Sequence, residues 1–520
     1  MNRKVFALLL ALTVCFLMSG CQPSIPVISG ENGAPEATLP PAPMLYDAPT
    51  GDAGLEYTTG VTLFLPRIDG VRLVAQQVDL TLPAGRHGAE EVLRALLDHP
   101  GNALVSPLSR TVKLQLNGTN PVEISRDVAT VNLAASAHQL ELRDYYMVCQ
   151  AITNTLTEFS DLRYVNVLVA GAQVGLDVSA TLPMGTLQRR TGEDVDALWE
   201  QAEAQRVLLS EDPSARRLST SVTLYYPARE GTGILPEVRN VSFEGQTPAQ
   251  LVKGLLQELS GGAQYLGNVP TLPGLVERLS QPPEVTELSG GLSGRKVTLH
   301  FTEELNEALI DNEVTRSACM ASLTYTLTTF LPGVVGVEVY IGDERVLSVS
   351  PSSPYTDQQS IEFADGLQLR SDFGALLLGY CRLYFATEGG KLAAVNRPLP
   401  YFQVKNPRYL LLELRKGPKG YDTVTGLKGV LPQEWDDKDL LGISLEGDTM
   451  LVNFSEAFKA SAQPLSGSQE RLMIYSMVNT LCENSAVSRV RFYVAGTQPD
   501  TLAGEIYLPG EFLPSPGMVD

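Results

Sequence analysis

A pattern that occurs three times limits the folds open to this chain of 520 residues. A short run that alternates apolar and polar residues, then ends on aromatic or apolar ones, starts at Val61, at Val222 and at Cys381. These starts lie 161 and 159 residues apart. Each run is typical of a half-buried strand, and the near-constant spacing indicates one structural unit used three times.

The most specific part of the repeat is an [Asn/Tyr]-Thr-Leu box that starts 17 residues before a glycine in every copy. Between the box and the glycine, a helical pattern gives way to a buried strand, and the glycine allows the chain to turn. An equal offset in three copies is hard to obtain by chance. The boxes are Asn154–Leu156, Tyr325–Leu327 and Asn479–Leu481, and the glycines are Gly171, Gly342 and Gly496.

Each unit also shows a helical pattern and a hairpin signature between the first strand and the box. The helices are expected over 89–98, 247–259 and about 407–416, and the hairpins over 122–133, 285–301 and 443–454. In the second unit, Thr247 is a suitable N-cap and Pro248 suits the first helical turn. The predicted order is β–β–α–β–β–α–β in units of about 125 residues. We therefore expect an α+β fold of three small α/β sandwich modules, with helices on one face of a mixed sheet.

This order, with its box and closing glycine, resembles the GerMN domain of GerM-type sporulation and spore germination lipoproteins from endospore-forming bacteria. The hairpin exits at 452–458 and 297–305 and the tail at 504–509 resemble those of the family. Two features differ: residues 131–136 lack the acidic continuation, and the family usually carries two copies. The resemblance implies a ring-building-motif-like fold and a role in binding, without catalytic residues. It also implies assembly with extracytoplasmic proteins between mother cell and forespore.

The N-terminus is typical of an export signal. Arg3 and Lys4 precede an apolar stretch over 5–18, and small residues then lead to Cys21, as in a bacterial lipobox. We expect cleavage before Cys21, attachment of lipid to its sulfur, and a location on the outer face of the cytoplasmic membrane. A plain secretory signal with an incidental cysteine, or an uncleaved anchor helix, is the alternative. The apolar run is short for a membrane span.

The rest of the chain divides by composition. Seven prolines fall between residues 22 and 58, which indicates a disordered, semi-extended tether. Residues 188–219 contain twelve charged residues and are expected to form a short charged helix, which serves as a spacer or binds a partner. Residues 350–378 are expected to mix linker with an added strand. The expected parts are a signal peptide (1–20), lipidated Cys21 with its tether (21–58), domain 1 (59–187), a charged linker (188–219), domain 2 (220–349), a linker (350–378) and domain 3 (379–520).

Charge narrows the classes of partner. Lys and Arg number 39 against 59 for Asp and Glu, which gives a net charge of −20. Because such a chain repels phosphate backbones, nucleic acid is excluded as a partner on electrostatic grounds. The acidic surface favours basic partners and disfavours docking on anionic lipid.

Residues that could carry chemistry are few and scattered. The four histidines have no second His or Cys at metal-ligand spacing, so neither a metal nor a cofactor is expected. The acidic groups are typical of solvated loops and first helical turns, although paired carboxylates could hydrolyse a glycan. The four remaining cysteines have apolar neighbours and are expected to be buried free thiols. These sets are His87, His99, His138 and His300; Glu303, Glu304, Glu307, Glu434, Asp436, Asp437 and Asp439; and Cys149, Cys319, Cys381 and Cys482.

The sequence therefore predicts a non-enzymatic envelope lipoprotein that acts as a structural or protein-interaction component, in sporulation or germination. Expected partners are the membrane, through lipid on Cys21, and envelope or sporulation-complex proteins, with self-association open. A module that binds a wall polymer or small ligand is the main alternative, and an aromatic cleft between units would favour it. A wall-remodelling enzyme would instead require convergent carboxylates with a raised carboxyl pKa.

Overall fold

The structure is a computed structural model that describes residues 48–177, 180–192, 194–207, 217–267, 269–289, 293–420 and 426–520. The signal sequence, Cys21 and most of the tether lie outside the described residues. Within the described ranges, no helix combines the length and apolar character needed to cross a bilayer.

The first repeat has the predicted order of elements, with a short 3-10 helix added before its second long helix. It contains β1 (Glu56–Pro66), β2 (Leu73–Pro83), α2 (Ala89–Leu97), β3 (Val122–Ser125), β4 (Val128–Leu133), η1 (Ala135–Gln139), α3 (Leu142–Leu156), β5 (Tyr164–Val169) and β6 (Leu187–Gln188).

The second repeat keeps this order and has a short α-helix, α6, at the place of η1. It contains β7 (Leu218–Pro227), η2 (Arg229–Gly231), β8 (Ile234–Phe243), α5 (Pro248–Ser260), β9 (Glu284–Glu287), β10 (Arg295–Phe301), α6 (Glu304–Asp311), α7 (Arg316–Phe330), β11 (Val334–Ile341) and β12 (Glu344–Arg345).

The third repeat follows the same plan, with α10 as its short helix. It contains β16 (Leu378–Ala386), β17 (Leu392–Pro400), α8 (Pro407–Arg415), η5 (Asp437–Asp439), β18 (Leu440–Glu446), β19 (Thr449–Phe454), α10 (Glu456–Ala462), α11 (Gly467–Asn484), β20 (Arg489–Val494) and η6 (Pro516–Met518).

Two connecting segments add elements of their own. Helix α4 (Val195–Val207) packs Trp199 against Tyr146 of α3, with ring centroids 5.9 Å apart. After the second repeat come β13 (Ser348–Val349), β14 (Ile361–Glu362), η3 (Ala364–Gly366), β15 (Leu367–Leu369) and η4 (Arg370–Leu376). Strand β15 pairs antiparallel with β11 and extends the sheet of the second repeat.

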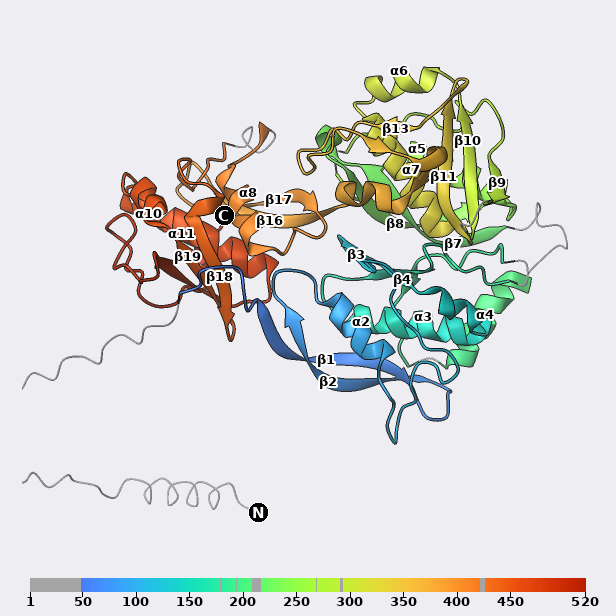
Figure 1. The fold of residues 1–520 in the computed structure, drawn as a ribbon, viewed down its shortest axis with the longest axis horizontal. Coiled ribbons are helices and arrows are strands. Elements are labelled where there is room, and N and C mark those ends of the chain that lie inside the picture. Colours follow the sequence, from blue (N-terminus) through green and yellow to red (C-terminus); the bar gives the residue numbers. More distant parts are fainter. Residues whose placement is uncertain are drawn as a thin grey trace, which may run out of the picture. The chain divides into compact units, whose positions relative to one another are not determined.

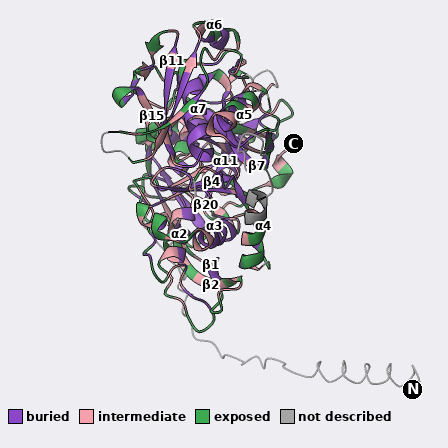
Figure 2. Ribbon diagram, turned by 90° about the vertical axis from the view of Figure 1, so that its right-hand side faces the viewer, coloured by how far each residue is buried: buried purple, intermediate pink, exposed green. Residues whose placement is uncertain are grey.

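Each repeat has three layers. The first two strands form an antiparallel hairpin, and the later strands form a mixed sheet in which β4 pairs antiparallel with β3 and parallel with β5. The long helix α3 lies between that hairpin and that sheet (Figure 1). Figure 2 shows its counterpart α7 buried along its length, as expected for a helix with apolar partners on both sides. The predicted α+β fold of small sandwich modules is confirmed.

The predicted Thr247 cap forms, and α11 begins with a second cap of the same kind. The Thr247 side chain accepts the backbone N–H of Gln250, whose side chain in turn accepts the N–H of Thr247. Ser466 and Gln469 form the same capping box at the start of α11. Both boxes satisfy N–H groups that have no partner within the helix.

The apolar interior has two parts. One buried cluster runs from Leu63 to Leu378 and takes side chains from the first and second repeats together. A separate cluster, from Cys381 to Leu508, forms the core of the third repeat. The first two repeats therefore share a core, which directs attention to the contacts between them.

Candidate functional site

The box threonine has a structural role in the first two repeats. Thr155 Oγ1 accepts the backbone N–H of Phe64 at 2.9 Å, and Thr326 Oγ1 accepts that of Tyr225 at 3.0 Å. Both N–H groups are buried in the first hairpin of their repeat, where an unpaired donor would be costly. The third copy differs, because Thr480 Oγ1 is buried without a hydrogen-bond partner.

This difference gives a prediction with an internal control. Replacing Thr155 or Thr326 by valine leaves a buried N–H unpaired, and each change should lower the free energy of unfolding by about 1–3 kcal/mol. Thr480→Val removes no hydrogen bond and should be neutral or slightly stabilising. Chemical denaturation of the three variants measures this. Equal losses in all three would contradict the assigned role.

The first position of the box separates the repeats further. Asn154 Oδ1 accepts the N–H of Arg190 at 2.9 Å, and Asn479 Oδ1 accepts that of Ser515 at 3.0 Å. Each partner stands 36 residues after its asparagine, so the amide holds the segment that follows the last strand. The second repeat has Tyr325 at this position, and its side chain contacts the first repeat instead.

Tyr325 belongs to a buried polar cluster between the first two repeats. Its hydroxyl donates to Glu123 Oε1 of β3 at 3.3 Å, and its ring centroid lies 4.0 Å from the Arg370 guanidinium carbon. Arg370 Nη2 pairs with Glu123 Oε2 at 2.5 Å, and Nη1 donates to Thr329 Oγ1 at 2.6 Å. Burial, and then the charge of Glu123, raises the pKa of Tyr325 well above its usual value, so the phenol stays protonated.

A second contact between these repeats uses neutral side chains. Asn166 of β5 is buried; its Nδ2 donates to Thr223 Oγ1 of β7 at 3.0 Å, and its Oδ1 accepts the Thr186 hydroxyl at 2.9 Å. The corresponding strand positions hold Glu338 and Arg491, which are ion-paired within their own repeats. The sheet of the first repeat therefore docks the first hairpin of the second through hydrogen bonds.

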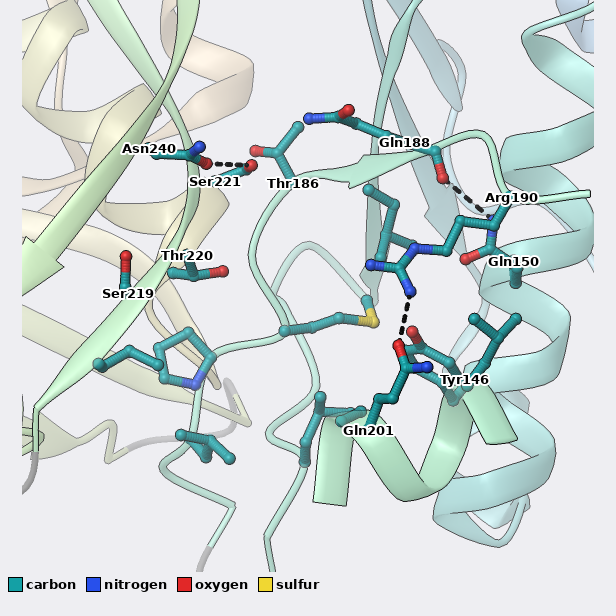
Figure 3. Close-up of a pocket in the computed structure, with 18 of the residues that line it drawn as sticks. Tyr146, Gln150, Thr186, Gln188, Arg190, Gln201, Ser219, Thr220, Ser221 and Asn240 are labelled. Carbon is teal, nitrogen blue, oxygen red and sulfur yellow. Dashed lines mark hydrogen bonds between the residues drawn. The ribbon is translucent and has the colours of Figure 1, made fainter. Parts of the chain in front are cut away.

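A pocket of about 350 Å³ opens beside this interface (Figure 3). Its wall comes from α3, the segment around β6, α4 and the β7–β8 hairpin, and it is lined mainly by amide, hydroxyl and aliphatic groups. Several polar groups already bond to one another, including Arg190 Nη1 with Gln201 Oε1 at 3.1 Å and Ser221 Oγ with Asn240 Oδ1 at 2.8 Å. Among the described residues that line the pocket, Tyr146 is the one aromatic residue and none is Asp, Glu, His or Cys.

The four histidines lie in separate parts of the fold. His87 and His99 accept backbone N–H groups of Ala89 and Gly101, His138 is in η1, and the His300 ring stacks on Tyr340. Among the described residues, no group of three or more His, Cys, Asp or Glu side chains could hold a metal ion.

His87 gives a prediction about acid stability. Burial lowers its pKa below 6.5, although the hydrogen bond and charge of Asp161 oppose the shift; Lys405 and Glu91 also act on it. The unfolded chain therefore binds a proton more readily, so the stability from neutral His87 is complete above about pH 6.5 and declines below it.

The matching variant is His87→Phe. Between pH 7.5 and 5.5 it should lose less stability than the natural chain, by on the order of 1 kcal/mol. His99→Asn, at a half-buried position in the loop after α2, is the control. Denaturation series at the two pH values test this, and an unchanged pH dependence in His87→Phe would contradict it.

The two acidic groups singled out in the sequence lie in different repeats, one in the second and one in the third. Glu303, Glu304 and Glu307 line a surface depression that also contains Arg316 and Arg345. A hydrogen bond from Thr302 lowers the pKa of Glu304, which is opposite to what a general acid needs. The second acidic group caps η5 and its flanking loop: Asp436 accepts Lys438 N–H, Asp439 accepts Asp436 N–H, Asp437 pairs with Arg408, and Glu434 accepts Gln433 N–H.

Asp372 has a carboxyl pKa that burial raises, and it accepts the N–H of Leu369 at 2.8 Å. This carboxylate caps η4.

The cysteines lie where unreactive thiols are expected. Cys149, Cys319 and Cys381 are buried as predicted, whereas Cys482 is half-buried, and burial raises the pKa of each thiol to about 12. A thiol with so high a pKa is a weak nucleophile at neutral pH. The four are Cys149, Cys319, Cys381 and Cys482.

Comparison with known families decides the identity of the repeats. The family model described as "Germane: Sporulation and spore germination" matches residues 62–175, 223–347 and 382–500, more than half of the chain. The chain belongs to the Germane family. One Germane domain falls in each repeat, and the predicted GerM-like tandem family is confirmed.

Solved Germane structures are similar at low identity. The tandem GerMN domains of the sporulation protein GerM from Bacillus subtilis share 19% identity, over 57% of this chain and 98% of that chain, with a TM-score of 0.21. The first GerMN domain of the same protein shares 20% identity, over 26% and 96%, with a TM-score of 0.19. No curated protein matches.

The box residues thus have structural roles within the Germane repeats, and Tyr325 of the second box also takes part in the contact between repeats. Glu123 and Arg370 were not singled out by the sequence, since each is an isolated charged residue. The one local signal was Tyr325, which replaces asparagine in the second box.

Proposed function

We propose that this Germane protein is a non-catalytic, lipid-anchored component of the bacterial cell envelope that acts by binding other proteins. The family links the chain to sporulation and spore germination. Lipid on Cys21 would hold the protein at the outer face of the cytoplasmic membrane, and a net charge of −20 would favour basic partner surfaces.

One observation carries this proposal: a Germane domain of this chain already serves as a protein-docking surface. The sheet of the first repeat binds the second repeat through Asn166 and Glu123, which contact Thr223, Tyr325 and Arg370. Buried hydrogen bonds and an ion pair of this kind specify one partner geometry, because each unmet group would be costly. We infer that the same module type binds proteins outside the chain.

A small polar ligand is the second candidate, and the pocket in Figure 3 favours it because its amide and hydroxyl groups suit a sugar or peptide fragment. Titration with soluble muropeptides tests this, comparing the natural chain with Gln201→Ala. Saturable binding that Gln201→Ala weakens would support the ligand function. The absence of saturable binding would leave protein contact as the function.

Replacement of Cys21 by alanine in the producing cells tests the anchored function. We expect the protein to leave the membrane fraction and spore yield or germination to fall, while the folded part keeps its thermal stability. A protein that remains in the membrane fraction after this change would contradict lipidation at Cys21. Full sporulation and germination with the displaced protein would contradict the need for an anchor.

A further inference from the structure

Residues 48–54, called the strap below, contact the third repeat although they precede the first in sequence. The Pro49 carbonyl accepts Asn453 Nδ2 at 2.9 Å, and the Gly54 carbonyl accepts the N–H of Leu445 at 3.3 Å. Asp52 Oδ1 accepts the N–H of Ile443 at 3.1 Å. These contacts span nearly the whole described sequence.

The strap covers a sheet edge. Strand β18 is an outer strand of the sheet β18–β19–β20, so alternate N–H groups along it point away from the sheet. The strap takes two of them in succession, those of Ile443 and Leu445. The Ile443 N–H bonds to the Asp52 carboxylate and the Leu445 N–H to the Gly54 carbonyl, so the strap covers the edge as a bent segment, with side chain and backbone together.

Arg408 on α8 binds the Asp52 side chain of the strap. Arg408 Nε donates to Asp52 Oδ2 at 2.6 Å, and Nη2 donates to Oδ1 at 2.8 Å, so the guanidinium binds the carboxylate with two parallel bonds. Its third nitrogen, Nη1, donates to Asp437 Oδ1 at 2.8 Å. This two-point geometry selects a carboxylate over an amide or hydroxyl.

Two further residues fit the strap's backbone. Asn453 is 1% exposed, and its Oδ1 accepts the N–H of Gly496 while its Nδ2 needs the Pro49 carbonyl. Gly442 leaves the space that the strap fills, since a Cβ atom there would lie 2.4 Å from Gly51 N and 2.5 Å from Pro49 O. The sheet thus has both a hydrogen-bond donor and a steric opening for this backbone.

In the other two repeats, the side chain at the position of Asn453 contacts a residue of its own repeat. Asn132 stands where Asn453 does, and its amide faces Asn117 of its own repeat at 3.5 Å. The second repeat has His300 there, stacked on Tyr340. Among the three repeats, the third takes its partner from a distant segment of the chain.

We propose that the β18 edge, with Gly442, Asn453 and Arg408, is a recognition site for a peptide segment that has an aspartate three residues after a proline, and that the strap is its ligand in cis. The docked strap holds the segment that follows the tether against the third repeat. If the tether is lipid-anchored as proposed above, the strap attaches the end of the tether to the third repeat. Docking itself does not depend on lipidation.

Hydrogen exchange of the amides in 440–448 tests the proposal, in the chain from residue 22 onward, which keeps all described residues. Asp52→Asn removes the carboxylate charge, and Gly442→Val fills the space beneath the strap; Gly442 has no positive φ, so valine is tolerated by the backbone. We expect Ile443 and Leu445 to exchange roughly tenfold faster in both variants. The matched control is Asp79→Asn on exposed β2, which should change nothing.

A synthetic peptide of residues 48–55 completes the test. In excess, it should restore slow exchange to Asp52→Asn and leave Gly442→Val unprotected. Equal exchange in the natural chain and Asp52→Asn would overturn the site. Protection that rises with protein concentration would overturn the cis assignment, because the strap would then come from a second copy. The chain from residue 22 onward lacks Cys21, so the outcome of this test does not depend on the anchor, and the two proposals can fail separately.

Discussion

Arg370→Met should lower the free energy of unfolding of the first two repeats by about 3–5 kcal/mol, because it leaves the Glu123 carboxylate without its buried partner. The Arg370 side chain is 10% exposed and Glu123 is 18% exposed, so water replaces little of the lost ion pair. The same change removes the cation over the Tyr325 ring and the donor to Thr329. The loss should therefore be several times that of a surface pair.

Two controls separate the ion pair from general damage. Arg94→Met breaks an exposed pair with Glu90 on α2 and should cost at most about 0.5 kcal/mol. The double variant Arg370→Met with Glu123→Leu should recover most of the stability, since no charge is then left buried and unpaired. A double variant less stable than Arg370→Met alone would contradict this explanation.

The two tryptophans allow the loss to be located. Trp199 packs on the first repeat, and Trp435 is buried in the core of the third. In Trp435→Phe, the fluorescence of the remaining Trp199 reports the unfolding of the first two repeats. In Trp199→Phe, the fluorescence of Trp435 reports the unfolding of the third repeat. Arg370→Met should shift the transition seen by Trp199 and leave that seen by Trp435 nearly unchanged.

Glu470→Gln should lower the free energy of unfolding of the third repeat by roughly 3 kcal/mol or more and leave the first two repeats nearly unchanged. Glu470 is fully buried near the start of α11, and its Oε1 accepts the N–H groups of Leu502 and Ala503 at 3.0 and 2.7 Å. Its Oε2 accepts those of Glu505 and Ile506 at 2.9 and 3.0 Å. Glutamine offers one oxygen, and its NH₂ group would face two further donors.

The exposed Glu505→Gln is the matched control for this change, because it alters the same charge in the same segment. We expect it to shift the Trp435 transition by no more than about 0.5 kcal/mol. If Glu470→Gln were as mild as Glu505→Gln, the four hydrogen bonds would not hold the C-terminal segment on α11.

The sequence predicts what depends on local periodicity and spacing. The order of elements, the Thr247 cap and the threefold repeat all follow from patterns within one repeat, where side-chain period and capping chemistry act over a few residues. The box was also recognised, but its role was not. That role depends on the hairpin strand that lies 91 residues earlier for Thr155 and 101 earlier for Thr326.

The contacts that join distant segments could not be predicted. Glu123 and Arg370 are 247 residues apart, and Asp52 and Arg408 are 356 apart. No period connects such pairs, and in a chain with 59 acids and 39 bases most charged residues are solvated. Only the packing of one repeat on another shows which charges are brought together.

Affinity capture with the chain from residue 22 onward tests the central claim, that these Germane domains act by binding proteins. The bait meets detergent-solubilised envelope from its own cells, taken in early sporulation and in vegetative growth. We expect stoichiometric recovery of one or more envelope proteins from the sporulating cells only. Recovery of muropeptide or wall polymer alone, or hydrolysis of that polymer by the bait, would contradict it.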